Sequence, residues 1–397
     1  MFEHLPRYAG DPILGLMSDF FADPRIDKVN LGVGIYYDEL GQVPLLDCVA
    51  QAEQVVVSEH KPRSYLPMEG ESAYRALVHQ LIFADSLDKR HFGTSIVQTV
   101  GGSGALKVGA DFLRTAWPGS EVWVSDPTWD NHLGIFEGAG LKVNRYPYYD
   151  PATQAFDYEG ALAVFKSIPV RSIVLLHPCC HNPTGIQPTR EQWIELLDAL
   201  QSREAIPFLD IAYQGFGQGL DDDAWVIREC AHRGMEFLVS SSFSKTFSLY
   251  GERVGALSVV SRIHDADLVF GQLKLSVRRN YSSPPIFGAA LVARVLGTPA
   301  LRQLWESELA TMRSRIVKMR AQLVDGLSKL MPERDFSFLQ RQEGMFAYTG
   351  LSAAQVRALK TDHGVYAVET GRICIAGLNP HNISRVCAAF ATVMRSA

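Results

Sequence analysis

The sequence lacks the features that mark a membrane or secreted protein. None of its apolar runs approaches the length of a membrane-spanning helix. The opening residues 1–7 have neither the basic start nor the apolar centre of a signal peptide. The six cysteines are scattered and contain no Cys-x-x-Cys pair, which is typical of reduced thiols in a cytoplasmic protein. We therefore expect a cytoplasmic location.

An excess of basic charge, internal repeats and low-complexity tracts are also missing. The formal net charge is −5, so nothing favours a nucleic-acid partner. Hydrophobic residues make up 47% of the chain and charged residues 20%, an ordinary globular balance. At 397 residues the chain is long for one core and suits a large domain with a smaller one.

Two familiar ligand motifs are incomplete. Gly102 and Gly104 begin a dinucleotide-like pattern, but Lys107 stands where a third glycine belongs, and a P-loop does not fit either. A second cluster has spacing that matches no standard zinc pattern, so buried core residues are favoured and no metal is expected. Its members are His177, Cys179, Cys180 and His181.

Short apolar runs alternate with helical patterns through the middle of the chain. Several runs are almost entirely apolar, as expected for strands covered by helices on both faces. The alternation predicts an α/β fold with a mostly parallel sheet. The strand candidates are Ser95–Val100, Glu121–Ser125, Lys142–Tyr146, Ser172–His177, Pro207–Asp210, Phe237–Ser240 and Gly255–Val260.

A long amphipathic helix is predicted after Pro299. Apolar residues recur at steps of three and four from Trp305 to Leu330. We expect this helix to join the sheet domain to a smaller C-terminal domain. The expected division is an N-terminal arm with part of the small domain (1–43), a large domain (44–312) and a small domain (313–397).

Lys245 is the most informative residue. It lies among small hydroxyl and aromatic residues, just after the apolar run 237–239. A lysine amine forms a Schiff base only when part of it is uncharged, and burial lowers its pKa. Arg253 follows closely, and its planar fork matches phosphate oxygens. Together they describe a pyridoxal phosphate site, although a solvated surface lysine is the alternative on this stretch alone.

Other polar residues stand where predicted strands end, and open α/β sheets bind ligands outside these carboxyl ends. Asp210 closes an apolar strand, where a carboxylate is costly unless a cation such as a protonated pyridine nitrogen meets it. Tyr213 follows at a distance that suits the oxygen of the same ring. The alternative for Asp210 is a helix N-cap.

Candidate ligand-binding residues follow three further predicted strands, and each of them also has a purely structural explanation. The glycine-rich stretch 101–105 begins a helical pattern and can offer N–H groups to an anion, or is a tight turn. Trp129 can stack on a flat ring or simply pack. Asn182 is held between turn-forming residues, although many Asn-Pro turns are only turns.

Two arginines suggest carboxylate recognition. Arg372 lies within an apolar run, where a substrate carboxylate would be a bidentate partner. Arg278 precedes the rigid turn 282–285 and offers a second cation, with a solvated surface as the alternative.

In this order the segments resemble the class I aminotransferases of fold type I, in the subgroup of aspartate and aromatic-amino-acid (tyrosine) aminotransferases. The likeness runs from Tyr8–Pro12 to Arg372–Gly377, and it is most specific in 181–185 together with 242–255. It implies a mostly parallel seven-stranded sheet in a large domain that binds pyridoxal phosphate. A smaller α/β domain is built from both chain ends. The implied reaction is a ping-pong exchange between amino acids and 2-oxo acids.

The resemblance also implies roles at the cofactor. Lys245 forms the imine and moves the proton between the substrate Cα and the cofactor C4′. Asp210 pairs with the pyridine nitrogen, and Trp129 stacks on the ring. Tyr213 and Asn182 hydrogen-bond O3′. The phosphate is held by Ser103, Gly104, Ala105, Ser242 and Arg253, with Tyr65 from the neighbouring subunit of a homodimer. Ala105 replaces a hydroxyl residue that is common in aspartate-type relatives, so it offers only its N–H group.

At the substrate, the resemblance implies that Arg372 binds the α-carboxylate, with Gly34 and Asn182 beside it. Tyr65 and Trp129 also line the substrate site. Arg278 crosses the dimer interface to bind the distal carboxylate of aspartate or glutamate. His132 and His177 match positions behind Asp210.

The substrate preference rests on two opposing features. Arg278 favours dicarboxylic substrates, with 2-oxoglutarate as acceptor. Tyr37, Val43 and Ser64 stand where aspartate-type relatives usually carry polar residues, which lowers the cost of burying an uncharged ring. We expect dual specificity, with a plain aspartate aminotransferase as the alternative. A lyase or decarboxylase that uses the same cofactor and a non-catalytic ligand sensor are the rivals from other classes. The sensor is disfavoured because no basic module remains.

Overall fold

A computed structural model of the protein describes residues 2–5, 10 and 12–396. Tyr8, Ala9 and Asp11, where the predicted likeness begins, lie outside the described residues. The chain divides into two compact units. The large unit comprises residues 44–314, and the small unit comprises residues 1–43 and 315–397. Across the described part of the chain, no helix combines the length and apolar character that a membrane crossing needs.

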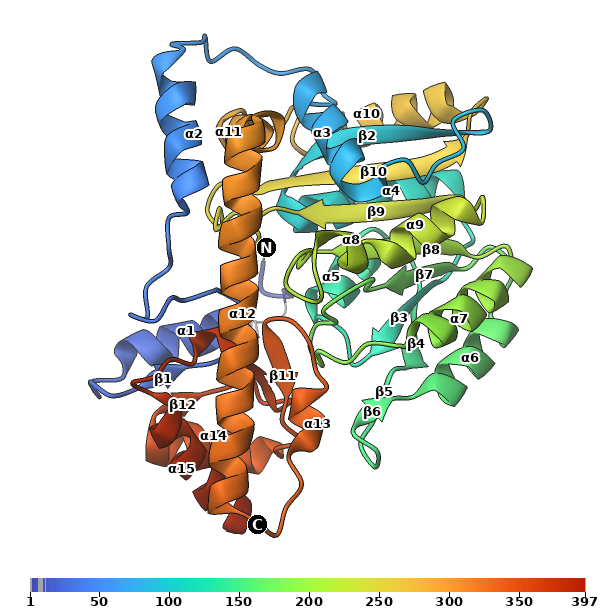
Figure 1. The fold of residues 1–397 in the computed structure, drawn as a ribbon. Coiled ribbons are helices and arrows are strands. Elements are labelled where there is room, and N and C mark those ends of the chain that lie inside the picture. The colour runs from blue at the N-terminus through green and yellow to red at the C-terminus, as the bar shows by residue number, and fades with distance from the viewer. Residues whose placement is uncertain (1, 6–9, 11, 397) are drawn as a thin grey trace. The chain divides into compact units, whose positions relative to one another are not determined.

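A seven-stranded sheet forms the centre of the large unit, which confirms the predicted sheet (Figure 1). β10 is antiparallel to both of its neighbours, and the remaining pairings in this sheet are parallel. In spatial order the strands are β2 (Phe92–Val100), β10 (Val254–Arg262), β9 (Phe237–Ser242), β8 (Ile206–Ile211), β7 (Ile173–Leu176), β3 (Val122–Asp126) and β4 (Val143–Pro147).

Helices cover both faces of this sheet (Figure 1), which explains why β7 and β8 are buried along their whole length. α4 (Gly101–Ala116) and α10 (Ala266–Asn280) pack on each other on one face. The other face carries α3 (Ser72–Phe83), α6 (Tyr158–Ser167), α7 (Arg190–Ser202) and α9 (Trp225–His232). The remaining elements of this unit are α2 (Asp47–Ser58), β5 (Tyr149–Asp150), β6 (Ala155–Phe156), α5 (Asn131–Gly138), α8 (Leu220–Asp223) and α11 (Phe287–Gly297).

The small unit is assembled from both ends of the chain, as predicted. β1 (Val29–Asn30) pairs in parallel with β12 (Val365–Tyr366), so the N-terminal segment joins a C-terminal strand. β11 (Phe346–Tyr348) pairs antiparallel with β13 (Arg372–Cys374). The helices are α1 (Pro12–Ala22), α13 (Ser337–Gln340), α14 (Ala353–His363), α15 (Ile383–Arg395) and the short 3₁₀ turn Ile375–Gly377.

α12 (Pro299–Leu330) is the long helix that the apolar spacing predicted, and it continues from the large unit into the small one. In the small unit, Arg315 of α12 donates hydrogen bonds to the carbonyls of Asp38 (3.0 Å) and Leu378 (2.6 Å). These bonds join the N-terminal and C-terminal segments through one buried guanidinium.

Close packing of α4 on the sheet depends on Gly109. A Cβ atom added there would lie 2.5 Å from the Phe208 ring of β8. We expect Gly109→Ala to destabilise the large unit by about 1–3 kcal/mol, because the sheet cannot recede from the helix. Thermal unfolding midpoints should therefore fall by several degrees.

Gly138→Ala is the matched control, because a Cβ atom at this helical glycine would meet nothing within 4 Å. Alanine there should be neutral or stabilise by up to about 1 kcal/mol. Equal melting temperatures for the two variants would contradict the close-packing argument.

Candidate active site

The strand directions bring the predicted site residues to one edge of the sheet. Because β2, β9, β8, β7 and β3 run the same way, their carboxyl ends share that edge, and β10 begins there. Val254 of β10 pairs with Val100 of β2, and Gly255 pairs with Ser242 of β9. This register places Arg253 beside the start of α4 and the turn that carries Lys245.

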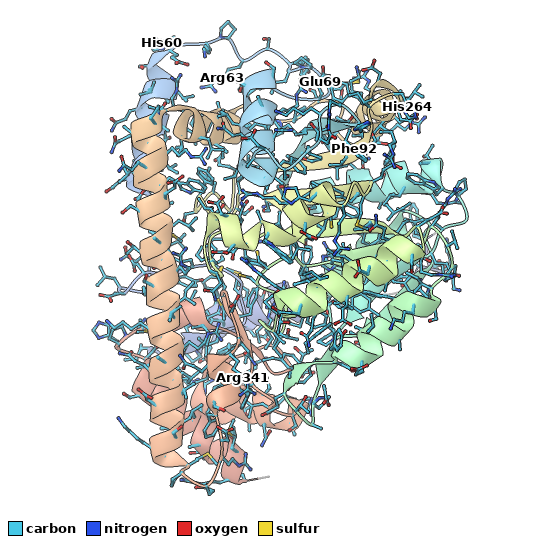
Figure 2. The ribbon with its side chains drawn as sticks, turned by 45° about the vertical axis from the view of Figure 1, so that its right-hand side comes forward. His60, Arg63, Glu69, Phe92, His264 and Arg341 are labelled. Carbon is cyan, nitrogen blue, oxygen red and sulfur yellow. The ribbon has the colours of Figure 1, made fainter. Side chains whose placement is uncertain are left out.

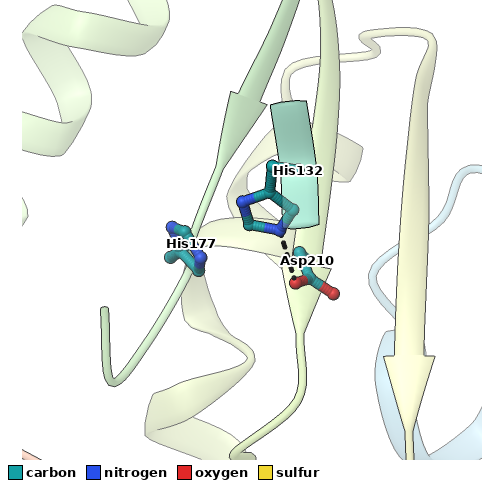
Figure 3. Close-up of side chains that lie close together, drawn as sticks. All are labelled: His132, His177 and Asp210. Carbon is teal, nitrogen blue, oxygen red and sulfur yellow. Dashed lines mark hydrogen bonds and ion pairs between the residues drawn. The ribbon is translucent and has the colours of Figure 1, made fainter. Parts of the chain in front are cut away.

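Asp210, next to the end of β8, is a buried carboxylate held by His132 (Figure 3). Its Oδ2 lies 3.2 Å from His132 Nε2, and Thr128 Oγ1 lies 2.8 Å from His132 Nδ1. Burial alone would raise the pKa of Asp210. The hydrogen bonds from His132 and Ser240 to the carboxylate oppose burial, and the pKa of Asp210 is lowered below its ordinary value. Asp210 is therefore ionised at neutral pH, and His132 Nε2 must be the donor.

Neutral imidazoles lie behind this pair. The His177 ring lies 5.2 Å from that of His132 and 4.5 Å from that of His181 (centroid distances). Burial lowers the pKa of His177 to about 3 and that of His181 well below its usual range. Neither therefore carries a charge at neutral pH, so neither neutralises the Asp210 carboxylate.

The sequence suggested only two roles for His181, a core residue or a metal ligand. In the structure its hydrogen bonds fix the turn that contains Asn182. Its Nε2 lies 2.9 Å from Ser125 Oγ of β3, and its Nδ1 lies 2.8 Å from Thr184 Oγ1. Its ring stacks on Tyr148 at 3.7 Å. Asn182 is buried next to it. Sequence reasoning missed Ser125 and Tyr148 because their contacts with His181 join distant segments. Thr184 lies within the motif 181–185, but nothing in the sequence marks its bond to His181.

Lys245 lies in the turn between β9 and β10 and is half-buried. Its Nζ lies 5.1 Å from the centre of the Tyr213 ring. Tyr213 is buried three residues beyond Asp210. The structure thus brings the Lys245 amine close to the Tyr213 phenol, at the edge of the sheet where the ionised Asp210 lies.

Arg253 and Ser242 converge on the first turn of α4. A Cβ atom on Gly101 would lie 2.6 Å from Arg253 Nη2, and one on Gly102 would lie 3.0 Å from Ser242 Cβ. Arg253 Nη1 donates to Ser244 Oγ (3.3 Å) and to the Tyr250 carbonyl (3.0 Å).

The groups gathered here are of the kind that bind phosphate. In the part of the chain that the structure describes, Arg253 takes part in none of the ion pairs. Its charge adds to the positive end of the α4 dipole and to the N–H groups of the first helical turn, which includes Ser103 and Gly104. The Ala105 side chain is buried, so this residue offers its backbone alone. The residues present therefore fit the phosphate of the predicted cofactor.

Trp129 is half-buried in the loop before α5, and its ring lies 5.2 Å from that of His132, edge to face. It therefore belongs to the same cluster as Asp210. The cluster of His132, His177 and Asp210 also has the spacing of metal ligands. A hydrogen bond joins two of its three members, His132 and Asp210.

Tyr65 and Arg278 lie apart from this cluster and share an open groove of about 1050 Å³. Tyr65 is 95% exposed, in the connection from α2 to α3 whose course His60, Arg63 and Glu69 mark in Figure 2. Arg278 is exposed and donates to Ser282 Oγ. Neither Lys245 nor Asp210 lines the groove.

Arg372 and Gly34 meet at Phe346 inside the small unit. Arg372 is 4% exposed, its Nη2 donates to the Gly32 carbonyl at 2.6 Å, and its guanidinium lies 4.4 Å from the Phe346 ring centre. A Cβ atom on Gly34 would lie 2.8 Å from the same ring. A side chain at position 34 would therefore require the Phe346 ring to shift.

An α/β sheet whose carboxyl edge carries a lysine, an ionised buried aspartate and a phosphate-type helix terminus defines a phosphate-cofactor enzyme. Residues 26–390 match the model of the aminotransferase class I and II family, and the chain belongs to this family.

Characterised relatives cover both predicted specificities. The chain is 55% identical over 397 residues to the aromatic-amino-acid aminotransferase of Escherichia coli K12, covering 99% of this chain and 100% of the relative. It is 50% identical over 394 residues to an aspartate aminotransferase of Pseudomonas aeruginosa, covering 99% and 98%.

A solved relative shows the same fold. The aromatic-amino-acid aminotransferase of Burkholderia pseudomallei, covalently bound to pyridoxal phosphate, is 48% identical and matches with a TM-score of 0.96 over 99% of each chain. The predictions of a type I fold, of an aminotransferase and of pyridoxal phosphate as its cofactor are confirmed.

The buried imidazoles make stability depend on pH. The pKa of His177 is about 3 in the folded protein and about 6.5 in an unfolded chain. Between these values the unfolded chain binds a proton that the folded protein does not. The free energy of unfolding therefore falls on acidification below pH 6.5, by at most about 1.4 kcal/mol per pH unit for this histidine.

We expect His177→Leu to reduce the loss of unfolding free energy between pH 7 and pH 5 by about 2 kcal/mol. Urea titrations at the two pH values measure the difference. The exposed His60, replaced by leucine, serves as the control and should leave the pH dependence of the wild type in place. A His177→Leu protein that loses as much stability as the wild type would show that this histidine is not buried in its neutral form.

Proposed function

We propose that the protein is a pyridoxal phosphate-dependent transaminase that accepts both aromatic amino acids (tyrosine, phenylalanine) and dicarboxylic ones (aspartate, glutamate). Its acceptors would be 2-oxo acids such as 2-oxoglutarate. The observation that carries the proposal is the convergence of Lys245, the ionised Asp210 and the Arg253 site on one edge of the sheet. One relative at 55% identity is named an aromatic-amino-acid aminotransferase and another at 50% is named an aspartate aminotransferase. Sequence identity alone therefore does not decide between the two substrate classes.

The large unit is proposed to hold the cofactor. Bound there, pyridoxal phosphate would act as an electron sink that makes the substrate Cα–H bond acidic. Ser103, Gly104, Ala105, Ser242 and Arg253 would hold its phosphate. Asp210 would favour a proton on the pyridine nitrogen, and each pKa unit by which it does so is worth about 1.4 kcal/mol.

The other proposed roles belong to side chains that orient groups or move protons. Lys245 would supply the amine for covalent attachment and carry the proton at the substrate Cα. Tyr213 and Asn182 would hydrogen-bond the oxygen of the ring, and Trp129 would stack on its face. The hydrogen bonds of His181 to Ser125 of β3 and to Thr184 support this role for Asn182, because they fix the turn that contains Asn182.

Substrate carboxylates would meet two arginines of different character. Arg372, buried against Phe346, would bind the α-carboxylate, and Gly34 and Asn182 would contribute to recognition of the same group. Arg278 and Tyr65 would serve the site of a partner subunit in a homodimer. Their exposure in one shared groove supports this, because both side chains are open to another molecule.

Tyr37, Val43 and Ser64 support the acceptance of aromatic side chains. Burial raises the pKa of Tyr37, so its hydroxyl stays neutral. None of the three side chains brings a charge. A cytoplasmic location is proposed as well, because the six cysteines are buried and, within the described residues, none forms a disulfide.

Lys245→Ala should abolish turnover while pyridoxal phosphate still binds through its phosphate contacts. Amino-acid-dependent formation of a 2-oxo acid measures turnover, and equilibrium dialysis measures binding. Lys274→Ala is the matched control, because Lys274 also places its Nζ over an aromatic ring, 4.8 Å from the centre of Phe270. Multiple turnovers by the Lys245→Ala protein would remove this lysine from the mechanism.

Arg278→Leu should lower kcat/KM for aspartate at least about tenfold, because a charge-assisted hydrogen bond is worth about 1.5–3 kcal/mol. The value for phenylalanine should change little. Arg279→Leu, at the adjacent exposed arginine, should affect neither substrate.

Equal losses on both substrates would refute the role of Arg278. The same measurements on the wild type decide the specificity. A phenylalanine value several orders of magnitude below that for aspartate would leave the alternative, a plain aspartate aminotransferase.

A further inference from the structure

Lys245 belongs to a segment without regular structure, so other contacts must fix its position. Residues 243–253 connect β9 to β10 and lie outside both strands. The ends of this segment are held by hydrogen bonds from Phe243 N to Val254 O (3.0 Å) and from Gly101 N to Arg253 O (2.9 Å). Local hydrogen bonds close the turn, with Phe247 N donating to Phe243 O at 3.3 Å and Ser248 N donating to Lys245 O at 3.1 Å. These bonds define a compact turn but do not attach it to the rest of the large unit.

Trp305 of α12 attaches this turn directly after the lysine. Its Nε1 donates to the Thr246 carbonyl at 2.7 Å, and its indole stacks on the Phe247 ring at 4.6 Å and 15°. Trp305 is 1% exposed and Thr246 is also buried. The Thr246 carbonyl is therefore held by a donor that water cannot readily replace.

A second attachment lies at the other end of the turn. Ser248 Oγ donates to the Pro44 carbonyl at 2.6 Å. Residues 44–48 are fixed in turn by α12, because the Glu308 carboxylate accepts hydrogen bonds from Asp47 N (2.6 Å) and Cys48 N (3.1 Å). One helix thus holds the lysine turn both directly, through Trp305, and indirectly, through Glu308 and Pro44.

We propose that Trp305 is a positioning residue for Lys245, acting through the Thr246 carbonyl and the Phe247 ring. The inference rests on the proposed role of Lys245 and extends it to a residue 60 positions further along the chain. A role in packing alone would need the indole ring but not its N–H group. Removal of the indole N–H group should therefore change the properties of Lys245 if Trp305 positions this lysine, and should leave them unchanged if Trp305 only packs.

Trp305→Phe tests this difference, because phenylalanine keeps an aromatic ring against Phe247 and loses the donor. Loss of a hydrogen bond that leaves a buried acceptor changes an equilibrium by a factor of about 5 to 150. We expect the dissociation constant for pyridoxal phosphate to rise at least about fivefold. The pH midpoint of the absorbance of the bound cofactor should shift by about 0.7 unit or more, the same factor on the pH scale.

Tyr146→Phe is the matched control. The buried Tyr146 hydroxyl also donates to a backbone carbonyl, Leu175 O at 3.0 Å, so its loss removes the same kind of bond. This variant should lower thermal stability to a similar extent and leave the cofactor absorbance and affinity unchanged. Ser248→Ala removes the second attachment and should shift the midpoint in the same direction as Trp305→Phe, even if Trp305→Phe folds poorly.

A measurement without cofactor separates this inference from the proposed function. Trace acetylation of the apoprotein with acetic anhydride, followed by peptide mass spectrometry, gives the pH midpoint of the Lys245 amine itself. A shifted midpoint in Trp305→Phe but not in Tyr146→Phe supports the positioning role. Unchanged midpoints in both Trp305→Phe and Ser248→Ala overturn it. A wild-type protein that binds no pyridoxal phosphate would defeat the proposed function, while the acetylation comparison would still decide the role of Trp305.

Discussion

The arrangement of the site depends on one buried carboxylate that stays ionised. Asp210 is 7% exposed, and burial on its own would favour its neutral form. The hydrogen bond from His132 reverses that preference, and Thr128 orients the imidazole from behind. The imidazoles of His177 and His181 are neutral, so they do not cancel this charge. A fixed negative charge at the end of an apolar strand then attracts a cationic group, which is what a protonated pyridine ring offers.

The opposite charge is concentrated at the start of α4. Glycines at 101 and 102 let Arg253 and Ser242 approach the helix to distances that a side chain would prevent. The antiparallel insertion of β10 makes this possible, because it brings the residue before β10 to the edge where the parallel strands end. A ligand with a cationic ring and an anionic phosphate would thus meet complementary charge at both ends, and the lysine turn follows β9 beside them.

Much of the fold and the nature of the site could be predicted from the sequence. The apolar runs were long and strongly patterned, so seven strands and the helix after Pro299 were found with boundaries a few residues off. The two- and three-residue strands β1, β5, β6, β11, β12 and β13 were missed, because so short an element shows no periodicity. Lys245, Asp210 and Arg253 could be selected as candidates because each is a charge in an apolar or strand-end context. The contacts of His181 with Ser125 and Tyr148, and of Trp305 with Thr246, could not. They join neutral residues far apart in the chain, and nothing local marks them.

The two proposed carboxylate-binding arginines differ in a way that bears on specificity. Arg372 is buried, bonded to the Gly32 carbonyl and laid on the Phe346 ring, so its guanidinium has little freedom. Every amino acid carries the α-carboxylate that such a rigid group would recognise. Arg278 is exposed and donates a hydrogen bond to Ser282 Oγ, and an exposed bond of this kind costs little to break. A cation of this kind can meet a distal carboxylate when the substrate has one and remain in water when it does not. Arg372 would thus recognise the α-carboxylate of every substrate, and Arg278 would recognise the distal carboxylate only when it is present. This division would allow the enzyme to accept both aspartate and phenylalanine, because no unpaired buried charge would face the aromatic ring.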